Sequence, residues 1–208
     1  MDLLIIDTSS RMLTLAGEAG GRAFGLCLPD CGRAHSELLN RKMRELLEKE
    51  GLSLADFDLF GAVRGPGSFT GIRIGVTAAR ALCQVFEKPA LPLNGLEVLC
   101  EGEGPLCGAL DAGTGRLYVG AFDRGRELCP VQVIRREELP AFLAAHPHPL
   151  ISPEPGLGQL PSDPAADLLR AAKRKLPGGA VPFRELVPLY VRPCQAEENA
   201  KQTGRGGI

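Results

Sequence analysis

The sequence predicts an α/β fold built from two similar subdomains that face each other across a cleft. Short apolar stretches of strand length alternate with amphipathic stretches of helix length. A strand, an aspartate, a turn with a hydroxyl side chain and a returning strand occur twice, so that Asp7 of the first copy corresponds to Asp111 of the second. A glycine-rich turn also joins one apolar strand to a long helix, as in many α/β units.

The first half is expected to hold five strands and three helices, led by a hairpin with Asp7 at its tip. Each strand is a short apolar run, and each helix has apolar residues on one side. The expected elements are strands at 3–6, 12–16, 23–28, 59–63 and 90–93 and helices at 34–50, 70–87 and 95–101.

The second half repeats the hairpin after a boundary at EGEGP (101–105). We therefore expect an N-terminal subdomain at 1–103, a smaller C-terminal subdomain at 104–192 and a flexible polar tail at 193–208. The expected elements are strands at 106–110, 116–122 and 131–135, a helix at 136–145, a short strand at 151, a proline-rich loop at 147–164, a helix at 167–176 and an extended piece at 188–192.

Length and composition limit the class of protein. The 208 residues are 44% hydrophobic and carry a net charge of −1, which suits a globular chain. There is no run of like charge and no basic-aromatic patch, so the sequence disfavours a module that binds tRNA directly. The apolar runs are far below the ~20 residues that span a membrane, and the amino terminus does not resemble a signal peptide. We expect a cytoplasmic protein without membrane contact.

Cysteine and histidine usage favours no metal site. Seven cysteines are scattered without a C-x-x-C pair, as expected of reduced thiols. Cys27, Cys31 and His35 could form a metal clip, but three ligands around a Pro-Asp turn are weak support. His146 and His148 lie in a proline-rich segment, where a solvated loop is the favoured interpretation.

The most informative stretch is Ala62–Gln84, where the glycine-rich turn leads into the long helix. Ser68 or Thr70 can cap this helix. Its first N–H groups could hold an anion, but a tight strand-to-helix connection is the favoured interpretation. Small residues recur one turn apart at Gly71, Gly75 and Ala79, so their strip can pack closely either against the chain's own sheet or against a helix from another subunit. Beside this strip runs a polar stripe of Arg73, Thr77, Arg80, Gln84 and Glu87.

Several motifs resemble the TsaB (YeaZ) family, and together they span about residues 3–197. The most specific is the twelve-residue glycine run. The motifs are Ile5-Ile6-Asp7-Thr8-Ser9, the RGPGSFTGIRIG run at 64–75, Asp111-Ala112 before a Leu-Tyr strand, and Pro188-Leu-Tyr-Val-Arg192 followed by Ala196-Glu197. The resemblance implies the actin-like, Hsp70-like ATPase (ASKHA) fold, also called the glycoprotease (M22) fold, which agrees with the duplication.

The resemblance also implies a role in making N6-threonylcarbamoyladenosine in tRNA. TsaB-like proteins pair with the catalytic relative TsaD, and the ATPase TsaE joins them. TsaD transfers the threonylcarbamoyl group to adenosine 37 of tRNAs that read codons beginning with A. The implied partners are therefore TsaD and TsaE, with tRNA bound only through the complex and a homodimer when the chain is alone.

The residues favour a non-catalytic subunit, because the His-x-x-x-His metal pair of the catalytic relative is missing here. We expect no catalytic residue, no metal and no cofactor of the chain's own, while ATP or ADP at the joint with TsaD stays open. The alternative is a small actin-like enzyme, either a nucleotide-dependent kinase or a glycoprotease-like hydrolase.

The two N-terminal helices, at 34–50 and 70–87, are the implied partner surface. We expect Gly75→Leu to abolish binding to TsaD while the protein stays folded. A vestigial phosphate site is a second option, although turn and strand-end roles are favoured for its residues. The partner-binding candidates are Leu39, Met43, Leu46, Gly71, Arg73, Gly75, Val76, Ala79 and Arg80, and the phosphate candidates are Asp7, Thr8, Ser9 and Asp111.

Overall fold

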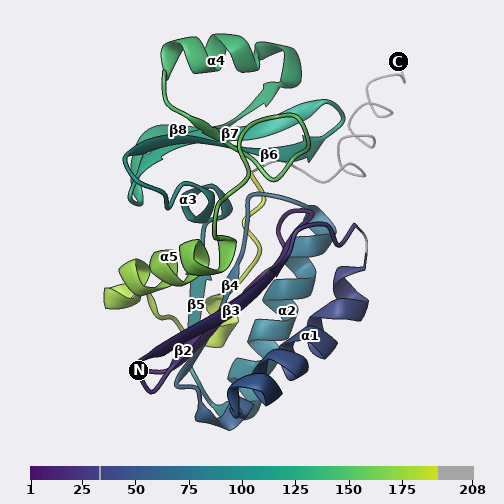
Figure 1. Cartoon of the computed structure of the whole chain (residues 1–208), viewed down its shortest axis with the longest axis vertical. Helices are drawn as coiled ribbons and strands as arrows, with labels where there is room; N and C mark the ends of the chain where they lie inside the picture. Colours follow the sequence, from purple (N-terminus) through teal and green to yellow (C-terminus); the bar gives the residue numbers. More distant parts are fainter. Residues whose placement is uncertain (33, 192–208) are drawn as a thin grey trace, which may run out of the picture.

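The computed structural model describes residues 1–32 and 34–191, and the tail expected at 193–208 lies outside the described residues. Two sheets follow one another along the long axis of the molecule (Figure 1). The first has the strand order β3-β2-β1-β4-β5. Its strands are β1 (Leu3–Asp7), β2 (Leu13–Ala19), β3 (Arg22–Leu28), β4 (Leu59–Val63) and β5 (Ala90–Leu93).

The second sheet repeats the topology of the first, with the strand order β8-β7-β6-β9. In both sheets the leading strand pairs antiparallel with the next strand and parallel with a strand that follows a helix. The predicted duplication is confirmed. Its strands are β6 (Pro105–Gly113), β7 (Arg116–Asp123), β8 (Arg126–Arg135) and β9 (Leu150–Ile151).

Helices cover both faces of each sheet. On the first sheet, α1 (His35–Glu50) and α2 (Phe69–Phe86) pack against the face that carries Leu4 and Ile6, because side chains alternate along β1. The opposite face, with Leu3 and Ile5, is covered by α5 (Pro164–Gly179). The second sheet lies between α4 (Leu139–Ala145) and α3 (Gly95–Leu99). Short 3-10 turns occur at Leu54–Asp56, Arg136–Glu138 and Phe183–Glu185.

The two halves exchange helices, which corrects the predicted subdomain limits. Helix α3, assigned by sequence to the first subdomain, packs on the second sheet, whereas α5, assigned to the second, packs on the first. The apolar side of α5 carries Leu168 and Ala172 and must be buried against a sheet. It packs on the first sheet because α3 and α4 already cover the two faces of the second. Figure 1 shows both helices between the two sheets.

Several element limits also differ from the prediction. Strand β8 begins at Arg126 rather than near 131, and Pro130 is tolerated because β8 is an edge strand. Helix α5 starts earlier, at Pro164, because Asp163 caps it by accepting a hydrogen bond from the Ala166 N–H (3.0 Å). Between β9 and α5 the second half has neither helix nor strand, in agreement with the expected loop.

Candidate functional site

Two concave surfaces contain residues that the sequence singled out. The first is the cleft between the two sheets, with a volume of about 580 Å³. The second is a groove of about 660 Å³ between α1 and α2, here called the α1–α2 groove. Its apolar lining comes from Leu39, Met43, Phe69, Ile74, Ala78, Ala81 and Leu82.

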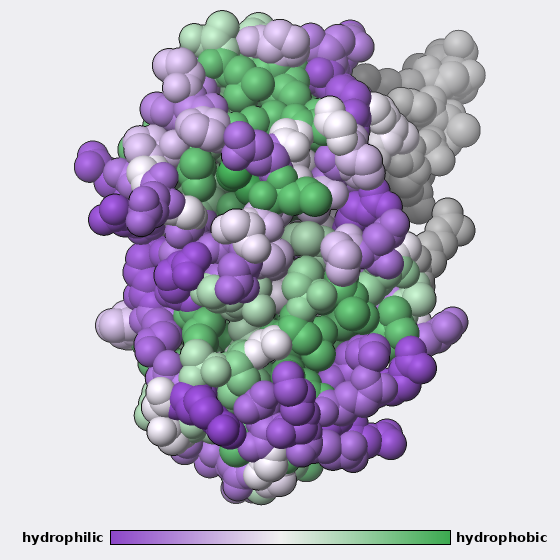
Figure 2. Space-filling view, viewed as in Figure 1, coloured by the Kyte–Doolittle hydropathy of each residue, from purple (hydrophilic) through white to green (hydrophobic). Residues whose placement is uncertain are grey.

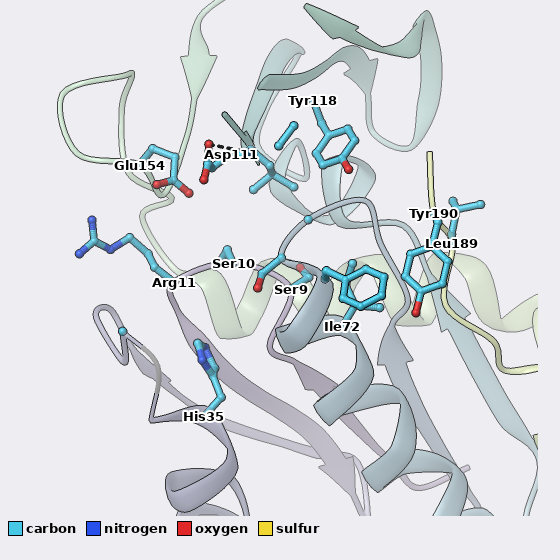
Figure 3. Close-up of a pocket in the computed structure, with 17 residues that line it drawn as sticks. Ser9, Ser10, Arg11, His35, Ile72, Asp111, Tyr118, Glu154, Leu189 and Tyr190 are labelled. Carbon is cyan, nitrogen blue, oxygen red and sulfur yellow. Dashed lines mark hydrogen bonds between the residues drawn. The ribbon is translucent and has the colours of Figure 1, made fainter. Parts of the chain in front are cut away.

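The cleft is formed by the tips of both hairpins and the start of α2 (Figure 3). Asp111 and Glu154 line it from the second half, and Ser9, Ser10 and Arg11 line it from the first. Asp7 does not line it, so the expectation that both acids face each other across the cleft is wrong. The Asp7 carboxylate instead accepts a hydrogen bond from the Ser9 N–H (2.8 Å), the local turn geometry that aspartate favours.

The charges in the cleft are mainly negative. Burial raises the pKa of Glu154, and the neighbouring Asp111 raises it further. Burial also raises the pKa of Asp7 behind the cleft wall. Arg11 is paired with Asp30 at 2.7 Å, and Figure 3 shows its side chain directed away from the cleft centre. A polyphosphate entering here would therefore meet two carboxylates, Asp111 and Glu154, and an arginine that is already paired.

The glycine-rich turn is used to fasten α2 to the end of β1. Thr8 Oγ1 donates to the Gly71 carbonyl (2.7 Å), and the Ser68 N–H donates to the Ser9 carbonyl (2.6 Å). Ser68 caps the helix by accepting from the Gly71 N–H (3.2 Å). Thr8 and Ser9 are buried. These contacts confirm the tight strand-to-helix connection and give Thr8 and Ser9 a structural role.

The small-residue strip on α2 faces the chain's own sheet, so the idea that it receives a helix from another subunit is wrong. A Cβ at Gly71 would overlap the Thr8 carbonyl oxygen, and one at Gly75 would lie 2.6 Å from Thr8 Oγ1. Ala79 is completely buried. The same contact argues against the expectation that Gly75→Leu leaves the fold intact, because the larger side chain would meet Thr8.

The other partner-binding candidates divide into buried and accessible residues. Leu46 and Val76 are buried in the core between the helices and the sheet, so their predicted role in an exposed surface is wrong. Leu39 and Met43 are also almost completely buried and present only their edges to the α1–α2 groove. The structure leaves Arg73 exposed and Arg80 half-buried.

Sequence reasoning missed the accessible apolar side of α2. Ile74, Ala78, Ala81 and Val85 recur at steps of four, three and four, which is a helical period that points to one side. The first three line the α1–α2 groove, and Val85 is 72% exposed. In the space-filling view, hydrophobic residues gather beside α2 and α1, with hydrophilic residues below them (Figure 2).

An aromatic pair lies between the groove and the cleft. The rings of Phe69 and Tyr190 stack with centroids 4.9 Å apart, and the Arg73 guanidinium lies 5.2 Å from the Phe69 centroid. Both rings are accessible, at 39% and 46% exposure. This stack holds Arg73 at the edge of the groove.

Within residues 1–32 and 34–191, no three His, Cys, Asp or Glu side chains are placed to hold a metal ion. His35 Nε2 lies 3.1 Å from the Met12 carbonyl, and Cys31 Sγ contacts the Leu28 carbonyl. None of the helices in the same part of the chain is long and apolar enough to cross a bilayer.

Comparison with known proteins places this geometry in a family. The family model described as TsaD, tRNA N6-adenosine threonylcarbamoyltransferase, matches residues 25–133. The tRNA threonylcarbamoyladenosine biosynthesis protein TsaB of Escherichia coli is 31% identical over 133 residues, covering 60% of this chain and 56% of the relative. A tRNA N6-adenosine threonylcarbamoyltransferase of Chelativorans is 40% identical over 76 residues, covering 36% of this chain and 21% of the relative. The chain therefore spans about half of the length of the first relative and about a fifth of the length of the second.

Solved structures agree over nearly the whole chain. YeaZ from Pseudomonas aeruginosa superposes with a TM-score of 0.75 at 25% identity, covering 91% of this chain and 99% of YeaZ. A protein similar to the peptidase YeaZ from the same organism gives a TM-score of 0.78 at 26% identity, covering 92% and 99%. The fold is therefore actin-like, as its duplicated sheets indicate. The chain belongs to the TsaB/YeaZ family of tRNA threonylcarbamoyladenosine biosynthesis proteins and shares the TsaD family model.

Proposed function

We propose that this chain is a non-catalytic subunit in tRNA threonylcarbamoyladenosine biosynthesis, and that it binds a TsaD-family protein through the α1–α2 groove. The accessible apolar side of α2 is the observation that carries this proposal. Monomeric proteins rarely leave such a surface uncovered without a use for it.

The TsaD family model supports this choice of partner. It matches residues 25–133, which include α1 and α2. A TsaD-family protein therefore has a corresponding segment, and two equivalent helix pairs can pack about an approximate twofold axis. Residues such as Ile74 and Ala78 can then fit between ridges of the partner's helices.

The chemistry of the cleft supports a non-catalytic role. Its wall presents Asp111 and Glu154, and its arginine is paired with Asp30. The Ser68 and Gly71 N–H groups, at the start of α2, are used by the chain itself. We therefore propose that the cleft binds no nucleotide and that catalysis, TsaE and tRNA enter through TsaD. ATP or ADP at the joint with TsaD is compatible with this assignment.

The first experiment measures the affinity of the chain for the TsaD protein of the same organism by isothermal titration calorimetry. Ala81→Asp introduces a charge at an exposed position of the groove, and Ala144→Asp is the matched control on α4. We expect Ala81→Asp to weaken binding at least tenfold and Ala144→Asp to leave it unchanged. Absence of binding by the wild type, or equal affinities of all three proteins, would contradict the proposal.

The second experiment asks whether the chain works alone. Purified protein is mixed with ATP, and phosphate release is followed with and without TsaD. We expect no turnover by the chain alone. Turnover that Asp111→Asn removes would instead support an actin-like enzyme.

A further inference from the structure

We infer that Arg174 locks a hinge between the two halves of the molecule, so that the cleft keeps a single width. This inference concerns the cleft and does not depend on the partner proposed for the α1–α2 groove. Relative rotation of two joined halves is expected unless a specific interface holds them. The exchanged helices α3 and α5 contact each other between the two sheets, and this contact is here called the α3–α5 joint (Figure 1).

The start of α3 provides a pivot. The Gly95 N–H donates to the Gly65 carbonyl in the glycine-rich turn (2.9 Å), so this end of the helix is bonded to the first half. Leu96 and Leu99 attach the same helix to the second sheet. A rotation of the second half about Gly95 would therefore change the distance between α5 and the far end of α3, near Glu101.

Arg174 on α5 holds this far end. Its guanidinium pairs with the Glu97 carboxylate (2.8 Å) and with the carboxylate of Glu101, which follows α3. The turn between β7 and β8 also lies against it, because a Cβ at Gly125 would overlap the guanidinium. One side chain of a helix that packs on the first sheet thus contacts three places in the second half.

Apolar side chains bring the two helices together but do not set their angle. Val98 of α3 packs in one cluster with Leu168 and Leu169 of α5. Such contacts are non-directional, so the helices could slide or rotate and keep most of them. The planar guanidinium of Arg174 presents its donors in a fixed geometry, and two carboxylates placed around it define one orientation. The charged contact is therefore the part of the joint that fixes the angle between the halves.

The ion pairs of the joint are sheltered from water. The Glu101 side chain is 5% exposed and the Glu97 side chain 18%. Sheltered charges attract each other more strongly than exposed ones, because water and salt screen them less. The neighbouring Lys173 pairs instead with Glu18 on β2, within the first half (2.7 Å). Lys173 therefore ties α5 to the first half, whereas Arg174 ties it to the second.

Residual dipolar couplings of backbone amides test the lock, because two rigidly connected halves share one alignment in a dilute liquid-crystalline medium. In the wild type, the couplings of the two sheets should fit a single alignment tensor. In Arg174→Met the halves should move independently, and the magnitudes of their alignment should differ at least twofold. Lys173→Met is the matched control on the same helix and should keep the single tensor.

A second variant separates the lock from stability. Arg174→Met leaves Glu101 without its cation, whereas Arg174→Met/Glu101→Met replaces both partners by apolar side chains and leaves no unpaired charge of this pair. Amide chemical shifts within each sheet report whether both halves are folded. We expect the double variant to be folded and to show the same twofold difference.

The remaining outcomes would overturn the inference. They are two alignment tensors in the wild type, a single tensor in either folded Arg174 variant, or a loss of the single tensor in Lys173→Met. Unfolding of both Arg174 variants would also overturn it, since Arg174 would then be required for the fold itself.

Discussion

Gly75 keeps α2 close to the end of β1, and replacing it with alanine should destabilise the protein. The new Cβ would lie 2.6 Å from Thr8 Oγ1, closer than real contacts of this type. Thr8 would have to rotate and lose its buried hydrogen bond to the Gly71 carbonyl, at a cost of about 1 kcal/mol. Overpacking adds about 1–3 kcal/mol, and the better helix propensity of alanine returns about 1 kcal/mol. The free energy of unfolding should fall by about 1–3 kcal/mol.

Gly71→Ala should cost more than Gly75→Ala. Its Cβ would overlap the Thr8 backbone carbonyl, which cannot move aside as a side chain can. We expect a loss above about 3 kcal/mol, at the upper end of overpacking effects. Thr77→Ala, on the exposed side of the same helix, is the control and should stay within about 0.5 kcal/mol of wild type.

Urea unfolding followed by circular dichroism measures these differences, and a double-mutant cycle tests the contact itself. Thr8→Ala removes the oxygen that the Gly75→Ala methyl group would meet. The two changes should therefore couple favourably by about 1 kcal/mol, so that the double variant is more stable than the sum of the single losses predicts. Additive losses, or a Gly75→Ala variant that is more stable than wild type, would refute the close approach of α2 to β1.

Three further predictions concern other contacts. Arg174→Met leaves the buried Glu101 without its cation and should cost about 3 kcal/mol in urea unfolding, whereas Lys173→Met, which removes an exposed ion pair, should cost under about 1 kcal/mol. Ser68→Ala removes the cap of α2 and should lower stability by about 1 kcal/mol, with Gly at this position costing less. Burial raises the pKa of Asp7 above its ordinary value of 3.8, so the folded protein binds this proton more tightly than the unfolded chain does. The contribution of Asp7 to stability should therefore fall as pH rises above about 4, and wild type should lose more stability than Asp7→Asn between about pH 4 and 7. Parallel plots of unfolding free energy against pH for the two proteins would contradict this.

Much of the fold could be predicted from local pattern. The strands around Asp7 and Asp111 are short apolar runs with turn residues at their ends, and their repetition indicated the duplicated sheets. Helix α2 was also clear, since its cap and its glycine-rich turn lie within a few residues. Such features depend on neighbours in the sequence.

The helix exchange between the two halves could not be predicted in this way. The apolar side of α5 fits either sheet, and the choice depends on which faces the other helices cover. The same limit applies to α2, whose small-residue strip and apolar side are both compatible with packing against a sheet. The close approach of Gly71 and Gly75 to Thr8 and the complete burial of Ala79 identify the inner side of the helix.

The acidic residues of the cleft also show what local sequence patterns can and cannot predict. Asp7 was expected in the cleft because it matches Asp111 in the repeat, but its carboxylate accepts a hydrogen bond from the Ser9 N–H and does not line the cleft. Glu154 was not singled out, because it lies in a proline-rich segment that has no repeat partner and reaches the cleft only through the folded chain.

Hydrogen–deuterium exchange of the chain with and without TsaD tests the central claim most directly. Backbone amides in α1 (His35–Glu50) and α2 (Phe69–Phe86) should exchange more slowly in the complex, while those of β8 and α4 in the second half keep their rates. Protection confined to the cleft or to the second sheet, with α1 and α2 unchanged, would contradict the assignment of the α1–α2 groove as the partner surface.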